Sequence, residues 1–180
     1  MCREERIVAD REYNNWIHYL KSMVMYPEIK IVHQYRKAKA YTVSKNFLVR
    51  SYWKIRWLMI RRKTGCQISL RSRIGKGFRL LHAGTRIIVG PAVLGENCTI
   101  GVNVIIGYSQ KNGCFGAPRI GDRVYIGHNS SIVGDISIGS DVLIAPNSYV
   151  NRDVPSHSVV IGNNIVIHKE NASAPYLNLA

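Results

Sequence analysis

The chain has 180 residues, which suits one or two domains with a buried core. Its 25 Lys and Arg outnumber 11 Asp and Glu, giving a formal net charge of +14, and no apolar run reaches membrane-spanning length. Eleven of the basic residues lie between Lys30 and Lys63, where no acidic residue occurs. Such a block is typical of a surface that meets an anionic partner: nucleic acid, an acidic membrane or a phosphorylated ligand.

Residues 1–64 have the pattern of a basic α-helical region. Asp10 is a candidate cap for a first helix, Pro27 stands where a second would begin, and Ser44 is a candidate cap for a third. Gly65 is placed to end that third helix.

The third predicted helix has one apolar face, formed by Leu48, Tyr52, Ile55 and Met59. One interpretation packs this face on the protein and leaves the opposite face, with Arg50, Lys54 and Arg61, simply solvated. The other lets residues 44–62 bind an anionic membrane surface through the basic face and the neighbouring Trp53 and Trp57. Nucleic acid is the weaker candidate, because we find no stacking platform or known binding motif.

Beyond residue 65 the sequence repeats every six residues. An aliphatic side chain recurs at this spacing, often followed by Gly, and we expect each one to point inward: Ile68, Ile74, Leu80, Ile88, Leu94, Ile100, Ile106, Ile120, Ile126, Ile132, Ile138, Ile144 and Val150. A period of six fits neither an α-helix nor a single strand, whereas it fits a short strand and a corner used repeatedly. The pattern predicts a mainly β protein built as a hexapeptide β-helix.

Two breaks in the period mark candidate functional positions. Leu80 and Ile88 are eight residues apart, so two extra residues lie beside His82. Ile106 and Ile120 are fourteen apart, which is two repeats plus two, and residues 108–118 read as a polar loop leaving the β-helix.

These patterns divide the chain into three parts. Residues 1–64 form the basic helical region, 65–168 the β-helix, and 169–180 a polar tail that we expect to be loosely held. Four scattered cysteines and an N-terminus without a secretory apolar region predict a cytoplasmic protein, peripheral at the inner membrane face if the basic helix binds lipid.

Three segments resemble the serine acetyltransferases: residues 74–90 (IGKGFRLLHAGTRIIVG), 116–127 (GAPRIGDRVYIG) and 151–163 (NRDVPSHSVVIGN). The resemblance covers roughly residues 65–167, and the basic lead-in is similar to that of serine-acetyltransferase-like proteins in polysaccharide gene clusters. It implies a left-handed parallel β-helix, a homotrimer and transfer of an acetyl group from acetyl-CoA to a hydroxyl.

The resemblance assigns His82 as the catalytic general base, a role that suits histidine near neutral pH. The sequence departs from the family at four positions around it, one of which is Leu81 in place of an aspartate just before the histidine. Gln67 replaces an aspartate expected to orient the histidine, and Gly116 and Ala117 replace an Arg-His pair whose arginine grips the carboxylate of serine. These departures favour an acceptor without a carboxylate, such as a sugar hydroxyl.

The family's coenzyme site maps onto the later coils. It implies acetyl-CoA contacts from the small or corner residues and from two cations near the closing turn: Gly134, Ala145, Pro146, Asn147, Arg152 and Lys169. We predict no metal, because His82 and His128 lack a third histidine at zinc-binding spacing.

The sequence therefore favours an acetyl-CoA-dependent O-acetyltransferase acting on a saccharide of a polysaccharide pathway. One alternative is a serine O-acetyltransferase. The other is a catalytically inactive trimeric β-helix that serves as a scaffold with a membrane-surface helix.

Overall fold

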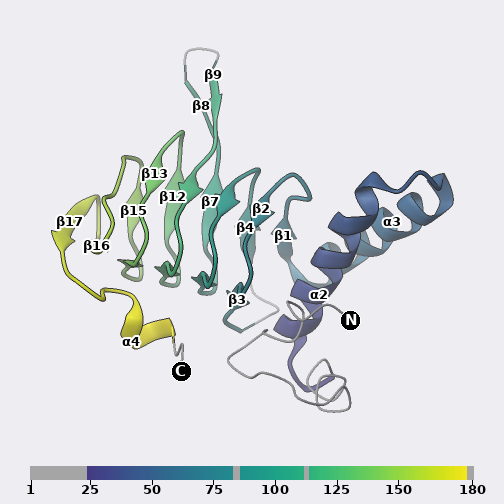
Figure 1. Ribbon diagram of the computed structural model, residues 1–180, viewed down its shortest axis with the longest axis horizontal. Coiled ribbons are helices and arrows are strands. Elements are labelled where there is room, and N and C mark those ends of the chain that lie inside the picture. The colour runs from purple at the N-terminus through teal and green to yellow at the C-terminus, as the bar shows by residue number, and fades with distance from the viewer. Residues whose placement is uncertain (1–23, 83–85, 112–113, 178–180) are drawn as a thin grey trace.

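The computed structural model describes residues 24–82, 86–111 and 114–177. Two helices, α2 (Pro27–Ala40) and α3 (Phe47–Thr64), are joined by the 3-10 turn η2 (Tyr41–Val43) and precede a coil of short strands (Figure 1). The helix predicted to begin after Asp10 lies outside the described residues. No helix in the described part of the chain has the length and apolar character needed to cross a membrane.

The strands form a parallel β-helix of about four turns with three sides. The first side is the five-stranded sheet β1 (Cys66–Ile68), β4 (Ile87–Val89), β7 (Ile105–Gly107), β12 (Ser131–Val133) and β15 (Tyr149–Val150). The second is the four-stranded sheet β2 (Arg73–Ile74), β5 (Val93–Leu94), β10 (Arg119–Ile120) and β13 (Ser137–Ile138). The third holds β3 (Arg79–Leu80), β6 (Thr99–Ile100), β11 (Tyr125–Ile126), β14 (Val142–Ile144), β16 (Ser158–Ile161) and the antiparallel β17 (Ile165–His168).

The aliphatic side chains at the six-residue spacing form the core, with one exception. Ile68, Ile100, Ile106 and their equivalents are buried, but Val89 rather than Ile88 takes the inward position of the second coil. Val89 pairs with Ile68 on one side and Ile106 on the other. The prediction for Ile88 was wrong because the extra residues beside His82 shift the strand by one position, and alternate residues of a strand face opposite ways.

The second break in the period is a β-hairpin. Strands β8 (Ser109–Lys111) and β9 (Cys114–Gly116) pair antiparallel and project from the β-helix (Figure 1). The pairs Ile106–Ile132 and Ile120–Ile138 show that 14 residues replace the usual six at one corner. The predicted loop is therefore confirmed as an excursion, and it adds eight residues to one corner.

Tight corners require residues that fit close to the neighbouring coil. A Cβ atom added to Gly127 would lie 2.5 Å from the backbone nitrogen of Pro146, so only glycine fits there. Asn103, Asn129 and Asn147 all have φ between 55° and 58°, in the left-handed region that asparagine tolerates. Their side-chain amides bond in a ladder, 2.9 Å from Asn103 to Asn129 and 3.1 Å from Asn129 to Asn147.

The C-terminal segment packs back on the β-helix, contrary to the expectation of a loosely held tail. The short helix α4 (Ala174–Leu177) ends at Leu177, which is 1% exposed and whose carbonyl accepts a hydrogen bond of 2.6 Å from Arg79. Tyr176 also packs against Tyr125, with ring centroids 5.0 Å apart. The small side chains Ala172 and Ser173 explain this packing, because both fit completely inside.

Helix α2 begins at Pro27 as predicted and covers the first coil. Its buried Tyr35 donates a hydrogen bond of 2.9 Å to the Ser72 carbonyl, and burial raises the pKa of this phenol to about 12 despite the nearby Arg36 charge. Lys39 donates to the same Ser72 carbonyl, and Arg36 donates to the carbonyl of Gly75. These bonds attach the basic helical region to the β-helix.

Helix α3 is capped by Asn46, not Ser44, because the Asn46 side chain accepts bonds from Leu48 (2.9 Å) and Val49 (3.3 Å). It ends at Gly65 as predicted, with φ at 70°.

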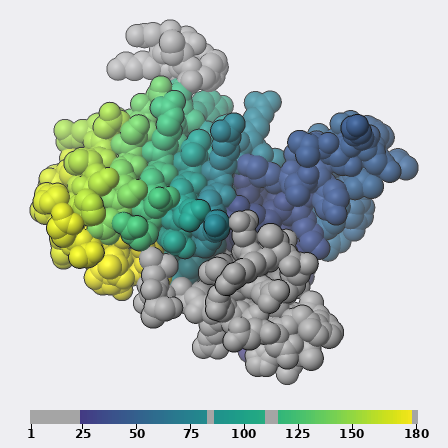
Figure 2. All heavy atoms as spheres, in the orientation of Figure 1, coloured from purple at the N-terminus to yellow at the C-terminus, as the bar shows by residue number. Residues whose placement is uncertain are grey.

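Helix α3 packs on the protein through a different face from the one predicted. Trp57 is 2% exposed and donates a hydrogen bond of 3.2 Å to the Ile68 carbonyl, so it is not free to meet a membrane. The predicted packing face is open instead: Leu48 is 75% exposed and Met59 58%. Helical periodicity identified an apolar row, but the single large Trp57 outweighs it by fitting beside Tyr35, with ring centroids 5.7 Å apart. The helix projects beyond the β-helix (Figure 2).

We predict that Trp57→Ala lowers the free energy of unfolding by about 3–5 kcal/mol, because it empties a buried aromatic site and removes a hydrogen bond. Urea unfolding followed by circular dichroism would measure the change. Met59→Ala on the same helix is the matched control and should change stability by less than about 0.5 kcal/mol. Similar losses for both variants would contradict the assignment of the packed face.

Candidate active site

His82 lies at the corner that leads from β3 into β4. Its φ of 55° is in the left-handed region, and its side chain is exposed. The Leu81 amide bonds to the Ile100 carbonyl at 2.9 Å, which holds the start of this corner on the next coil. This corner and its equivalents on the next coils form a row along the β-helix: residues 81–82 and 86, 101–104, 127–130 and 145–148. We call the whole row the His82 corner.

Three of the predicted coenzyme contacts lie on the same row. Ala145, Pro146 and Asn147 form its last described coil, and the exposed His128 lies on the coil before it. Asn147 already accepts a bond from Asn129, so the structure gives it a role in holding the coils together. The sequence signal for this ladder is the recurrence of Asn at equivalent corners.

Two predicted acceptor-site residues and two further predicted coenzyme contacts lie at a second row of corners. Gly116, Ala117, Gly134 and Arg152 all lie between the five-stranded and four-stranded sheets, within residues 108–118, 134–136 and 151–153. We call this row the hairpin corner. The Gly134 amide bonds to the Gly107 carbonyl at 3.2 Å, and the Arg152 guanidinium bonds to the Asn164 carbonyl at 2.6 Å.

Gly116 lies beside an exposed ion pair. An added Cβ atom would overlap the side chain of Asp135, so no larger residue fits here without movement. Asp135 is exposed and forms an ion pair of 3.5 Å with Arg119. The hairpin corner thus presents a paired carboxylate and guanidinium next to the position where the resemblance implied an arginine.

The His82 corner and the hairpin corner flank the same sheet. About five residues of strand separate them, which is roughly 15 Å at the rise of an extended chain. A general base must lie within hydrogen-bonding distance of the proton that it removes, directly or through one water. One subunit therefore does not bring His82 and Gly116 to the same acceptor hydroxyl.

Gln67 and Lys169 lie away from both rows. Gln67 is exposed on β1, pairs with Ile88 and faces a groove beneath α3. Lys169 is exposed after β17, and its amide bonds to the His157 carbonyl at 2.8 Å.

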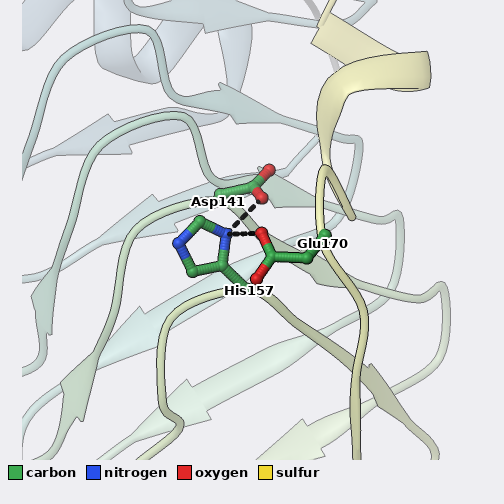
Figure 3. A group of neighbouring side chains, drawn as sticks. All are labelled: Asp141, His157 and Glu170. Carbon is green, nitrogen blue, oxygen red and sulfur yellow. Dashed lines mark hydrogen bonds and ion pairs between the residues drawn. The ribbon is translucent and has the colours of Figure 1, made fainter.

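A cluster of titratable side chains that the sequence did not suggest lies at the third corner of the β-helix. His157 Nδ1 is 2.9 Å from Asp141 Oδ2 and 3.0 Å from Glu170 Oε2 (Figure 3). Asp141 is buried, and its other oxygen accepts bonds from the Ser173 hydroxyl (2.7 Å) and amide (3.2 Å). Burial raises the pKa of Asp141, but the hydrogen bonds from Ser173 and His157 outweigh it, so the net pKa is lowered.

This cluster has the donor set of a divalent metal site, with one imidazole nitrogen and two carboxylates within 4.8 Å of one another. The same contacts also form an ion-pair network that attaches residues 169–173 to the β-helix, and this role alone would explain the cluster. Asp141 and His157 are equivalent corner residues of successive coils, and both have positive φ. Their spacing of 16 residues is the sequence feature that could have predicted their contact.

The three-sided coil carries the hexapeptide repeat of bacterial transferases. Residues 117–152 match the family described as bacterial transferase hexapeptide (six repeats), and residues 91–109 match the hexapeptide repeat of succinyl-transferase. The fold prediction is confirmed: the coil matches the left-handed β-helix of hexapeptide-repeat proteins.

Among these proteins, the chain is similar to serine acetyltransferases. It is 41% identical over 100 residues to serine acetyltransferase 4 of Arabidopsis thaliana, a match that covers 55% of this chain and 28% of that protein. The crystal structure of the serine acetyltransferase of Neisseria gonorrhoeae matches with a TM-score of 0.70 and 28% identity, over 84% of this chain and 58% of that one. The same enzyme in complex with serine matches with a TM-score of 0.68 and 30% identity, over 83% and 60%. This chain thus spans less than two thirds of each.

We predict that the cluster stabilises the C-terminal segment at neutral pH. The folded-state pKa of Asp141 is below its unfolded value, so this stabilisation is present above about pH 4 and is lost as pH falls through the folded pKa. Asp141→Asn should cost about 1–3 kcal/mol at pH 7 and less at pH 3, measured by thermal unfolding. It should also speed amide exchange at Ser173.

Glu96→Gln is the control for this experiment, because Glu96 is half exposed and its nearest cation, Lys76, is 3.9 Å away. A penalty for Asp141→Asn that stays the same from pH 7 to pH 3 would show that charge at Asp141 does not contribute.

Proposed function

We propose that this chain is the β-helix of an acetyl-CoA-dependent O-acetyltransferase. The observation that carries the proposal is the match of its β-helix to serine acetyltransferases, together with a histidine held at an exposed corner of the coil. The acceptor oxygen attacks the thioester carbon while His82 takes the hydroxyl proton. The carbon–sulfur bond then breaks, and the imidazolium returns the proton to the departing thiolate.

The proposed coenzyme contacts lie on both rows of corners, except for Lys169. Ala145 and Pro146 offer a surface without long side chains on the His82 corner, which allows close approach of an extended arm. Gly134 offers the same on the hairpin corner, and Arg152 nearby supplies a cation for phosphate.

We predict that His82→Ala lowers the turnover number by about 10²–10⁴-fold, the usual contribution of a general base. Release of the coenzyme thiol would report turnover, and calorimetry would show whether acetyl-CoA still binds. His128→Ala, on the same row of corners, is the matched control and should retain turnover. Near-normal turnover of His82→Ala would remove it from the mechanism.

The names of the relatives favour serine as the acceptor. A second candidate is a saccharide hydroxyl, which the surroundings of Gly116 favour. Asp135 next to Gly116 engages Arg119 at 3.5 Å, which makes that cation less available to hold the carboxylate of serine, and Asp135 itself repels that carboxylate, whereas a neutral sugar carries no such charge.

An acceptor panel would separate the two candidates. With Asp135 intact, we expect faster transfer to neutral monosaccharides than to L-serine, and Asp135→Asn should lower the KM for L-serine by removing the repulsion. Acetylation of L-serine alone, with no effect of Asp135→Asn on its KM, would establish serine as the acceptor and show that the charge at Asp135 has no influence.

We also propose a homotrimer with a shared site, since only a neighbouring subunit can bring a hairpin corner close to His82. Light scattering should give three times the chain mass of 20.3 kDa. His82→Ala and Ala117→Trp should each be inactive, yet mixed trimers of the two should regain activity because some sites then contain neither change. An active monomer, or mixtures that stay inactive, would contradict a shared site.

A further inference from the structure

A groove runs between helix α3 and the first two coils of the β-helix. Its volume is about 540 Å³. Trp57 and Leu58 form the helix side, and Ile88, Val89 and Gly90 form part of the opposite wall. The groove exists because Ile88 points outward and because α3 is fixed at this distance by the bond from Trp57 to the Ile68 carbonyl.

Three cations line this groove. Lys54 and Arg61 come from α3 and Arg71 from the turn after β1, so positive charge faces the space from two sides. Gln67 and Ser69 add neutral polar groups, and no acidic residue contributes to the lining. Such a combination suits a phosphate group, because guanidinium groups bind its oxygens through charge-assisted hydrogen bonds.

The described residues do not neutralise these charges. Within residues 24–82, 86–111 and 114–177, no carboxylate forms an ion pair with Lys54, Arg61 or Arg71. The Nε atom of Arg61 is buried and has no hydrogen-bond partner among those residues. A buried donor left without a partner is costly, so an acceptor atom in the groove would stabilise it.

A second copy of this chain is a poor source of that acceptor. Residues 1–63 carry fifteen basic residues against five acidic ones, and residues 64–180 carry ten against six. Both halves are therefore positive, and like charges oppose docking of either half on the groove.

We propose that this groove binds the phosphate group of an anionic ligand. Two sources offer this chemistry. One is the headgroup of an anionic lipid, which the exposed apolar row of α3 would meet at a bilayer surface: Leu48, Tyr52, Ile55 and Met59. The other is a soluble phosphate ester. The inference does not depend on acetyl transfer, so it is tested by binding alone.

Inorganic phosphate is the first probe, titrated into the full chain by calorimetry at about 0.15 M ionic strength. Arg61→Gln and Arg71→Gln should each weaken binding by about tenfold or more, as expected when a charge-assisted hydrogen bond is removed. Arg62→Gln is the matched control: it removes the same charge from an exposed neighbour on α3 that does not line the groove, and it should change binding less than threefold. Thermal unfolding would confirm that all three variants stay folded.

Vesicles distinguish the two sources. Co-sedimentation with phosphatidylglycerol in phosphatidylcholine, lost in Arg61→Gln and Arg71→Gln but kept in Arg62→Gln, would identify a lipid headgroup. Binding of phosphate without co-sedimentation would identify a soluble phosphate ester. No binding of either probe would overturn the proposal. Equal losses in the groove variants and in Arg62→Gln would also overturn it, since the overall positive charge of the helix, and not the groove, would then account for binding.

Discussion

The constraint on which this structure depends is the stacking of one coil on the next. Parallel pairing places each inward aliphatic side chain directly over its equivalent, as with Ile106 on Ile132, and the corners must pass within contact distance. Gly127 against Pro146 shows how little space remains there. An extra residue within a side would turn its side chains the wrong way, so insertions are confined to corners. Both breaks in the period, beside His82 and at the β8–β9 hairpin, obey this rule.

That confinement determines where chemistry can be located. The sides of the β-helix are covered by short, regular strands, whereas corners can carry a histidine, a hairpin or a cluster such as Asp141 with His157. The corners at either edge of one side stay roughly 15 Å apart because the strand between them has a fixed length. A narrow β-helix therefore favours a site assembled between subunits, and this physical argument supports the proposed trimer without any reference to relatives.

The sequence predicted the β-helix well because its period has one physical cause, the repeated coil. Prediction from the sequence failed where two possible packing positions competed. In the second coil the strand alternation selected Val89 over Ile88, and in α3 one buried tryptophan outweighed a longer apolar row. It missed the cluster around His157 because Glu170 reaches it only after β17 has reversed the chain direction. In the proposed trimer, how the predicted site residues act together depends on assembly, which no periodicity in one chain records.

The basic helical region and the β-helix are mechanically linked. Tyr35 and Lys39 bond to the turn before β2, and Trp57 bonds to the end of β1, so both helices are attached to the first coil. The groove lies at this junction and is lined by Ile88 and Val89 of β4, the strand that begins immediately after the His82 corner. A ligand that fills the groove would therefore contact the strand that holds one end of this corner. A packed element changes position only when it has a second stable arrangement available to it. A ligand bound in the groove is therefore expected to reduce the motion of the His82 corner more than to displace it.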